Sequence, residues 1–170
     1  SEILKKRFKS PFPALNVFRR DEPVAIDTVY SDVPAIDDGS TCAQLYVGTK
    51  TTLADVYGMK SEKQLVNTLE DNIRERGAMD KLISDCARAE TSTRIKGILR
   101  GEWQSEPYQQ HQNAAERRYQ TIKATTNRVV DRTGAPSNTW LLCLQYVCYL
   151  LNHAYNENHA GVPLTLLTGS

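Results

Sequence analysis

The sequence predicts an α/β domain with a mixed sheet of five strands, the first three antiparallel, flanked by helices. Strand-like runs dominate the first third of the chain, and helical patterns dominate the last third. A helical stretch also separates two strand-like runs between positions 51 and 85, as a crossover between parallel strands requires. With 170 residues, 40% of them hydrophobic, the chain is long enough to bury one core.

The expected strands begin with residues 24–29, which read Val-Ala-Ile-Asp-Thr-Val. The stretch 37–40, Asp-Asp-Gly-Ser, is typical of a turn. Residues 42–47 and 51–57 are rich in β-branched and aromatic side chains and predict a hairpin with a tight turn at Gly48-Thr49. Two further strands are expected, a buried run at 81–85 that ends in an acid and a short strand near Trp103.

The expected helices follow from apolar residues at helical spacing. Ser61-Glu62-Lys63-Gln64 has the form of a capping box, and the apolar stripe behind it stops at Gly77. The stripe consists of Leu65, Val66, Leu69 and Ile73. A weaker helix is expected at 90–99, and two longer ones at about 113–132 and 137–155.

Residues 1–23 predict an extended lead-in, and residues 24–170 the folded domain. The lead-in contains three prolines and a basic cluster, which would either touch phosphates or remain a solvated tail. The net charge of the whole chain is only +1, so any contact with DNA would depend on local patches.

Composition also limits the compartment and the partners. The longest apolar run, 140–151, is shorter than a membrane span requires, and we expect no membrane partner. The cysteines form no CxxC pair, and the histidines do not complete a zinc pattern. We therefore expect reduced thiols in an intracellular protein; the cysteines are Cys42, Cys86, Cys143 and Cys148.

Three carboxylates stand where α/β sheets place their chemistry. Asp27 and Asp85 lie at the ends of strand-like runs, and Glu116 lies on the first turn of an expected helix. Carboxylate oxygens suit Mg²⁺ or Mn²⁺, and two such ions would support displacement at phosphorus. The alternative is that Asp27 caps a strand and Asp85 a helix, and Glu90 and Glu106 are other candidates for the third ligand.

The helix that carries Glu116 has two distinct faces. At about 100° per residue, Glu116, Gln120, Lys123 and Asn127 share one narrow sector. The adjoining arc is suited to packing and comprises Ala115, Tyr119, Ile122, Thr126, Val129 and Val130. The polar face suits a surface that meets a phosphate chain, although a solvated helix would also carry charges.

These residues resemble a known family. Pro107-Tyr108 followed by Gln112-Asn113-Ala114-Ala115-Glu116-Arg117 looks like the signature of retroviral and long-terminal-repeat retrotransposon integrase cores, particularly the copia type. Matching pieces occur in the expected order, including Ala25-Ile26-Asp27-Thr28, Ile83-Ser84-Asp85, and Thr139-Trp140 with the tail after it. The resemblance spans 24–169 and implies a ribonuclease H-like fold.

The resemblance also implies an activity and its sites. It implies processing of the 3′ end and transfer of a cDNA strand into target DNA, with two Mg²⁺ (or Mn²⁺) ions held by Asp27, Asp85 and Glu116. It further implies a homo-oligomer acting in the nucleus, and a loop at 106–112 that closes over the reacting phosphate. The residues expected to contact DNA are Gln112, Asn113, Arg117, Gln120, Lys123 and Asn127.

Two alternatives remain open at the level of the sequence. One is a metal-dependent nuclease of the same fold, which uses water in place of a DNA 3′-hydroxyl. The other is a catalytically silent module for nucleic-acid binding or assembly. Cys86-Ala87 stands where the family usually has glycine or Asn-Gly, which would limit the close approach of the backbone to a substrate there.

Overall fold

The computed structural model describes residues 19–84, 102–104, 112–154 and 161–168. Its strands are β1 (Pro23–Tyr30), β2 (Cys42–Gly48), β3 (Ala54–Met59), β4 (Lys81–Ser84) and β5 (Glu102–Gln104). They lie in the order β3-β2-β1-β4-β5. Strands β1, β2 and β3 pair antiparallel, whereas β1 with β4 and β4 with β5 pair parallel. The predicted α/β class and mixed sheet are confirmed; four strands form the body of the sheet, and the three-residue β5 lies at its edge.

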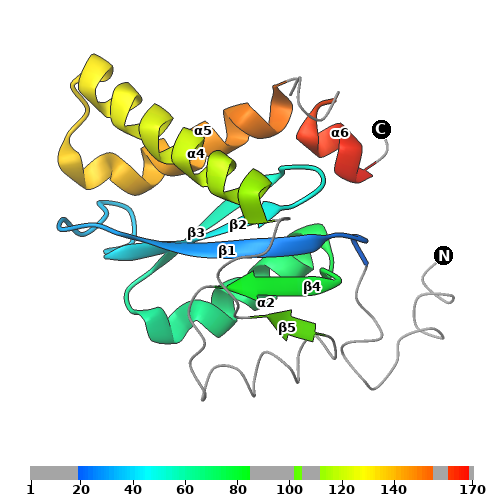
Figure 1. Cartoon of the computed structure of the whole chain (residues 1–170). Coiled ribbons are helices and arrows are strands. Elements are labelled where there is room, and N and C mark those ends of the chain that lie inside the picture. Colours follow the sequence, from blue (N-terminus) through cyan, green and yellow to red (C-terminus); the bar gives the residue numbers. More distant parts are fainter. Residues whose placement is uncertain (1–18, 85–101, 105–111, 155–160, 169–170) are drawn as a thin grey trace, which may run out of the picture.

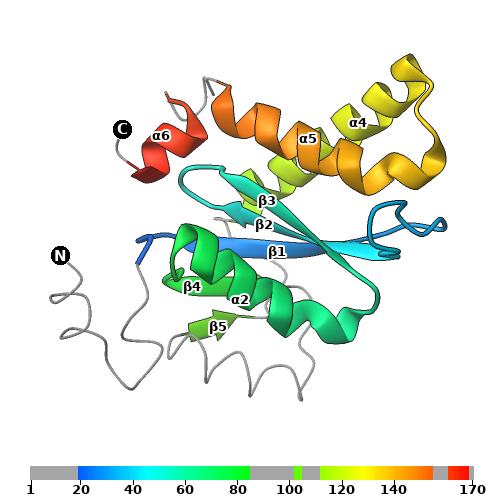
Figure 2. The ribbon, with the colours of Figure 1, turned by 180° about the vertical axis from the view of Figure 1, so that it is seen from behind.

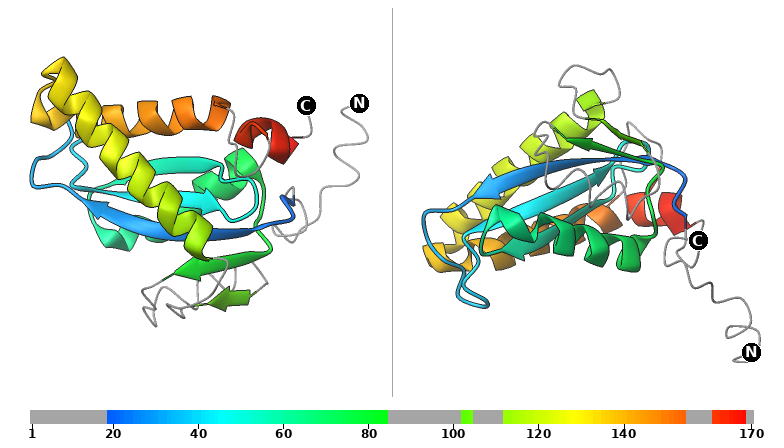
Figure 3. Two further views of the ribbon diagram at one scale, coloured as in Figure 1. Left: turned by 45° about the horizontal axis from the view of Figure 1, so that its top comes forward. Right: turned by 90° about the horizontal axis from the view of Figure 1, so that it is seen from below.

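Helices cover both faces of this sheet. Helix α2 (Leu65–Arg76) follows the short 3₁₀ helix η2 (Glu62–Gln64) and lies on one face (Figures 1 and 2). Helices α4 (Gln112–Thr133) and α5 (Trp140–His153), with η3 (Ser137–Thr139) before α5, lie on the other face. Helix α4 runs obliquely across the strands (Figure 3), and α6 (Pro163–Thr168) follows near the C-terminus. The helix predicted at 90–99 lies outside the described residues.

Two hydrophobic clusters, one on each face, follow from the alternation of side chains along the strands. Ala25 of β1 packs with Ile122 of α4 and Leu144 of α5. Val24 and Ile26, its neighbours in β1, pack in the other cluster, on the face that α2 covers. A central strand buried on both faces fixes the register, because a slip by one residue would exchange the two sets.

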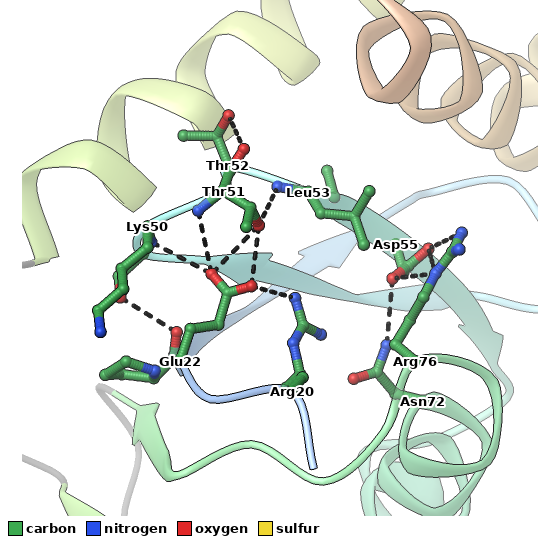
Figure 4. Close-up of polar contacts among 12 residues, drawn as sticks. Arg20, Glu22, Lys50, Thr51, Thr52, Leu53, Asp55, Asn72 and Arg76 are labelled. Carbon is green, nitrogen blue, oxygen red and sulfur yellow. Dashed lines mark hydrogen bonds and ion pairs between the residues drawn. The ribbon is translucent and has the colours of Figure 1, made fainter. Parts of the chain in front are cut away.

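The predicted tight turn at Gly48-Thr49 is wrong. Strand β3 begins only at Ala54, and the amide of Gly48 donates to the carbonyl of Leu53 at 3.0 Å, so a longer loop joins the strands. The cause is Glu22, whose buried carboxylate accepts hydrogen bonds from the backbone amides of Lys50 and Thr51 (Figure 4). A side chain before β1 therefore sets the shape of the hairpin loop.

The capping box predicted at Ser61–Gln64 is also wrong, because neither of its two expected hydrogen bonds forms. The Ser61 side chain makes no capping hydrogen bond. The side-chain oxygen of Gln64 instead accepts from the backbone amide of Lys60 at 2.7 Å. The predicted end of the helix at Gly77 is confirmed, since Gly77 is the C-cap with φ at 96°, a conformation that glycine adopts readily.

One further expectation, a turn, is confirmed by the described residues. The turn at 37–40 is present, and the backbone amide of Ser40 donates to the Asp38 carboxylate at 2.9 Å. Cys42, Cys143 and Cys148 are free thiols. In the part of the chain that the structure describes, no helix has the length and apolar character to cross a membrane.

Candidate active site

Asp27 lies on β1, the central strand of the sheet, but not at its end as predicted, because the strand continues to Tyr30. Asp27 shares the strand face of Ala25, on which α4 and α5 pack, because alternate residues point to the same side. Strand β4 ends beside it, with Ser84 paired in parallel register to Ile26. Asp85, the second predicted acid, lies outside the described residues. The structure therefore places Asp27 at the junction of the central strands and the α4 layer.

An ion pair joins Asp27 to α4. The Nζ of Lys123 lies 2.9 Å from the Oδ2 of Asp27, and the two side chains are 44% and 31% exposed. Lys123 was expected on sequence grounds to contact DNA, and Asp27 to bind metal. The structure brings these two residues together and places a cationic group directly against the carboxylate.

The two faces predicted for α4 are confirmed. Glu116, Gln120, Lys123 and Asn127 are exposed, whereas the packing face is buried, with relative exposures of 1% at Ala115 and 0% at Ile122. Because α4 begins at Gln112, Glu116 lies just beyond its first turn, not within it. Helical geometry separates Glu116 from Lys123 by about 10 Å along the axis.

Glu116 and Lys123 lie about two turns apart on the same face of α4. The Lys123 ammonium and the Glu116 carboxylate thus lie on the same exposed face, with Asp27 beside it on β1. Of the predicted acids, Asp27 contacts this face of α4 directly, through Lys123.

The remaining predicted DNA contacts also lie on α4. Arg117 and Gln120 are exposed. Gln112 and Asn113 form the start of the helix, and nothing is described of their side chains. The structure shows these residues along one helix but contains no nucleic acid.

Sequence reasoning missed Arg118, which holds the N-terminal part of α4 in place. Its guanidinium donates to the carbonyl of Thr52 at 3.2 Å and to that of Leu151 at 3.0 Å. Burial lowers the pKa of this arginine. Arg118 ties α4 to the β2–β3 loop and to the end of α5, next to Glu116 in sequence. Nothing in the sequence distinguished it from the other arginines of the helix.

The donor chemistry of Asp27 suits a hard divalent cation. Its carboxylate supplies oxygen ligands, which Mg²⁺ and Mn²⁺ prefer, and the ammonium of Lys123 already occupies a cationic position against it. Within the described ranges, no group of three histidine, cysteine, aspartate or glutamate side chains is close enough to hold a metal ion. A site with three acids would therefore need an acid from outside the described residues, where Asp85, Glu90 and Glu106 all lie.

The fold is that of retroviral integrase catalytic core domains. The catalytic core of BIV integrase superposes with a TM-score of 0.66 at 15% identity, over 87% of this chain and 94% of that one. The HTLV-2 integrase core in complex with magnesium gives 0.64 at 14% identity in its trimeric form, over 88% of this chain and 97% of that one. The dimeric form of the same core gives a TM-score of 0.64 at 13% identity, over 90% of this chain and 98% of that one.

A longer chain from a viral assembly shows the same fold. A chain of the simian T-cell lymphotropic virus intasome, in complex with PP2A regulatory subunit B56 gamma, gives a TM-score of 0.68 at 14% identity. The match covers 89% of this chain and 55% of that one, so this chain spans about half its length. No protein-family model matches the sequence, and no curated protein does so.

Proposed function

We propose that this chain is the catalytic core of an integrase that processes a DNA 3′ end and transfers it into a target strand. The observation that carries the proposal is the contact between Lys123 of α4 and Asp27 of β1. It brings an acid on the central strand to the polar face that also bears Glu116. The integrase-core fold supports this assignment.

The proposed cofactor is Mg²⁺ or Mn²⁺, two ions held by Asp27, Asp85 and Glu116. Such ions stabilise charge on the attacking and leaving oxygens during displacement at phosphorus. Two features of the chain support this ligand set. Ile26 pairs with Ser84, and these two residues directly precede Asp27 and Asp85 in the sequence. Glu116 is exposed on α4. A magnesium complex of the HTLV-2 integrase core is in line with it.

The proposed substrate is the end of a retroelement cDNA, bound along α4. Lys123 would contact a phosphate next to the reacting one, since its ammonium is within reach of Asp27. Gln120 and Asn127 would follow the same strand, and their exposure leaves their amides accessible. Gln112, Asn113 and Arg117 would meet DNA at the other end of the helix. Because the proposed reaction acts on host DNA, we propose that the protein works in the nucleus.

The test is strand transfer with Mn²⁺ by the wild type and by Glu116→Gln. The amide keeps the size of the side chain but removes the charge that binds metal, so we expect transfer to fall below detection. Glu70→Gln is the matched control, because Glu70 is an exposed acid on α2, on the opposite face of the sheet. Equal transfer by wild type and Glu116→Gln would remove Glu116 from the proposed mechanism.

Two further measurements separate the other functions that this fold could serve. Supplying both water and a DNA 3′-hydroxyl as acceptors, and sorting the products, distinguishes strand transfer from hydrolysis by a nuclease. A thermal melt with and without Mn²⁺ identifies a silent module, because a metal that binds the folded state must raise the melting temperature. An unchanged melting temperature at millimolar Mn²⁺ would contradict the proposed metal site.

We also propose that the chain acts as a homo-oligomer through α5. Four large hydrophobic side chains of this helix are exposed, at 44–61% of their full surface. A contiguous apolar surface on a helix favours association, and the HTLV-2 integrase core occurs in dimeric and trimeric forms. The four residues, called the α5 surface below, are Leu142, Tyr146, Tyr149 and Leu150.

A further inference from the structure

A pocket opens beside the candidate active site that the proposed function has not used. It lies between the end of β1, the middle of α4 and the start of α5, and has a volume of about 330 Å³. This volume lies within the range of small-ligand sites, about 300–1,000 Å³. Lys123 lines the pocket and also contacts Asp27, so the pocket begins one side chain away from the proposed metal site.

Two aromatic side chains line the pocket, and each is held through its polar group. Tyr30, at the end of β1, is 66% exposed, and its hydroxyl donates to the Glu62 carboxylate. The indole N–H of Trp140 donates to the carbonyl of Val33 at 2.7 Å. The Trp140 ring is therefore fixed by its indole bond, whereas the Tyr30 ring remains largely exposed. Exposed aromatic faces stack on nucleobases.

The rest of the lining combines apolar and hydrogen-bonding groups. Val29 and Leu144 supply apolar surface, and Asn127 supplies a side-chain amide. An amide can both donate to and accept from the edge of a base. The charged group in the lining is the ammonium of Lys123, which favours a ligand joined to a phosphate.

We propose that this pocket binds a nucleobase of the DNA strand, one adjacent to the phosphate that reacts at the proposed metal site beside Asp27. The base stacks on Tyr30, Asn127 binds its edge, and Lys123 contacts the phosphate that joins it to the reacting nucleotide. This subsite rests on the proposed function, since it needs a DNA strand at Asp27. The pocket would fix the position of the strand by holding one inserted base, in addition to the reaction at the neighbouring phosphate.

The test uses DNA ends in which one nucleotide at a time, near the 3′ terminus, lacks its base. Affinities are measured by fluorescence anisotropy in Ca²⁺, without turnover, for the wild type, Tyr30→Ala and Tyr30→Phe. Stacking of a base on an aromatic ring is worth about 1–3 kcal/mol, so we expect one abasic position to weaken binding by at least about fivefold. Tyr30→Ala should lose a similar amount of affinity for intact DNA. Its affinity for the abasic DNA should fall little further, because the missing base and the missing ring remove the same contact.

Tyr30→Phe is the matched control, since it keeps the ring and removes only the hydroxyl that bonds Glu62. It should bind intact DNA close to the wild-type affinity. A second readout uses Trp103→Phe, which leaves Trp140 as the only tryptophan of the two in the chain. Its emission should be quenched by intact DNA and less by the DNA that lacks the critical base.

The outcomes separate this subsite from the proposed function. If the wild type binds DNA and neither Tyr30→Ala nor any abasic position weakens the complex, the subsite is wrong and the proposed function stands. Additive losses would also overturn it, because the base and Tyr30 would then act independently. If the wild type does not bind DNA ends at all, both proposals fail together.

Discussion

At the scale of single residues, the contact between Lys123 and Asp27 has a consequence for metal binding. The ammonium of Lys123 occupies one oxygen of Asp27 and partly neutralises its charge, which weakens the attraction of the carboxylate for a metal cation. Exposed ion pairs contribute about 0.2–1 kcal/mol, so the competition is modest. It nevertheless couples metal binding to the release of the lysine that is proposed to hold phosphate.

This coupling predicts the behaviour of Lys123→Met. The substitution removes the competing charge at a distance of 2.9 Å from Asp27, and Mn²⁺ should bind about twofold to fivefold more tightly without DNA. DNA binding should weaken and become less dependent on salt. Isothermal titration with Mn²⁺ measures the first effect, and Lys123→Arg, which keeps the charge, is the control. Unchanged Mn²⁺ affinity in Lys123→Met would show that the ion pair does not oppose the metal.

A second residue-scale prediction concerns Gly48. A Cβ built at this position would lie 2.2 Å from the Oε1 of Glu22, and that carboxylate is held by Arg20 at 3.0 Å and by the amide of Thr51 at 3.1 Å. Because the carboxylate has little freedom to move, Gly48→Ala should destabilise the protein by about 1–3 kcal/mol. Urea denaturation measures this loss.

The shorter side chain of Glu22→Asp provides the control for Gly48→Ala. Withdrawing the carboxylate by one methylene group makes room for the added methyl group. The further cost of Gly48→Ala in that background should therefore be smaller than in the wild type. An equal cost in both backgrounds would mean that the clash with Glu22 is not the cause.

At the scale of elements, a largely buried ion pair is among the contacts that join β3 to α2. The carboxylate of Asp55 in β3 bonds Arg76, the last residue of α2, at 3.1 Å, and it also accepts from Asn72 (Figure 4). Burial raises the pKa of Asp55, and Arg76 opposes that rise. Arg76 thus offsets part of the penalty that burial places on the charged form of Asp55.

Arg76→Leu should therefore destabilise the protein in a way that depends on pH. Without Arg76, the pKa of Asp55 in the folded state rises further above that of the unfolded chain. At pH 7 the buried charge has lost its partner, and the expected loss is about 3 kcal/mol. As the pH falls through the folded pKa, Asp55 takes up a proton and the difference from the wild type shrinks toward pH 4. Urea denaturation at both pH values tests this, with Arg76→Lys as the control; a loss independent of pH would exclude Asp55 as the cause.

The helices and strands differ in how far their sequences determine them. Helix α4 was predictable because a buried position recurs every three or four residues, as at Ala115, Tyr119 and Ile122. The β2–β3 loop was not predictable, because its shape depends on Glu22, which lies outside the hairpin. Local patterns predict elements whose cause is local, and they miss those determined by a distant side chain.

At the scale of the whole molecule, the same distinction applies to the candidate site. The helical period placed Glu116 and Lys123 on one face of α4, and the resemblance to integrase cores added Asp27 to the same site. It did not predict that Lys123 would bond Asp27, nor that Tyr30 and Trp140 would line a pocket beside them. These contacts depend on how α4 and α5 cross the sheet, and no periodicity in the sequence specifies that crossing.

The last prediction concerns assembly through the α5 surface. Tyr146 is 54% exposed and Leu150 44% exposed, so neither is needed to complete the core of one chain. Placing two lysines there, as Tyr146→Lys with Leu150→Lys, should leave the unfolding free energy of the single chain nearly unchanged. It should break a homo-oligomer, because charged groups are strongly disfavoured at the centre of an interface. Sedimentation velocity should show the wild type as a dimer or larger species and the double variant as a monomer.

Leu166→Lys, at a residue of α6 that is 42% exposed, is the matched control and should sediment as the wild type does. If the wild type sediments as a monomer at high concentration, the proposed homo-oligomer through the α5 surface is wrong.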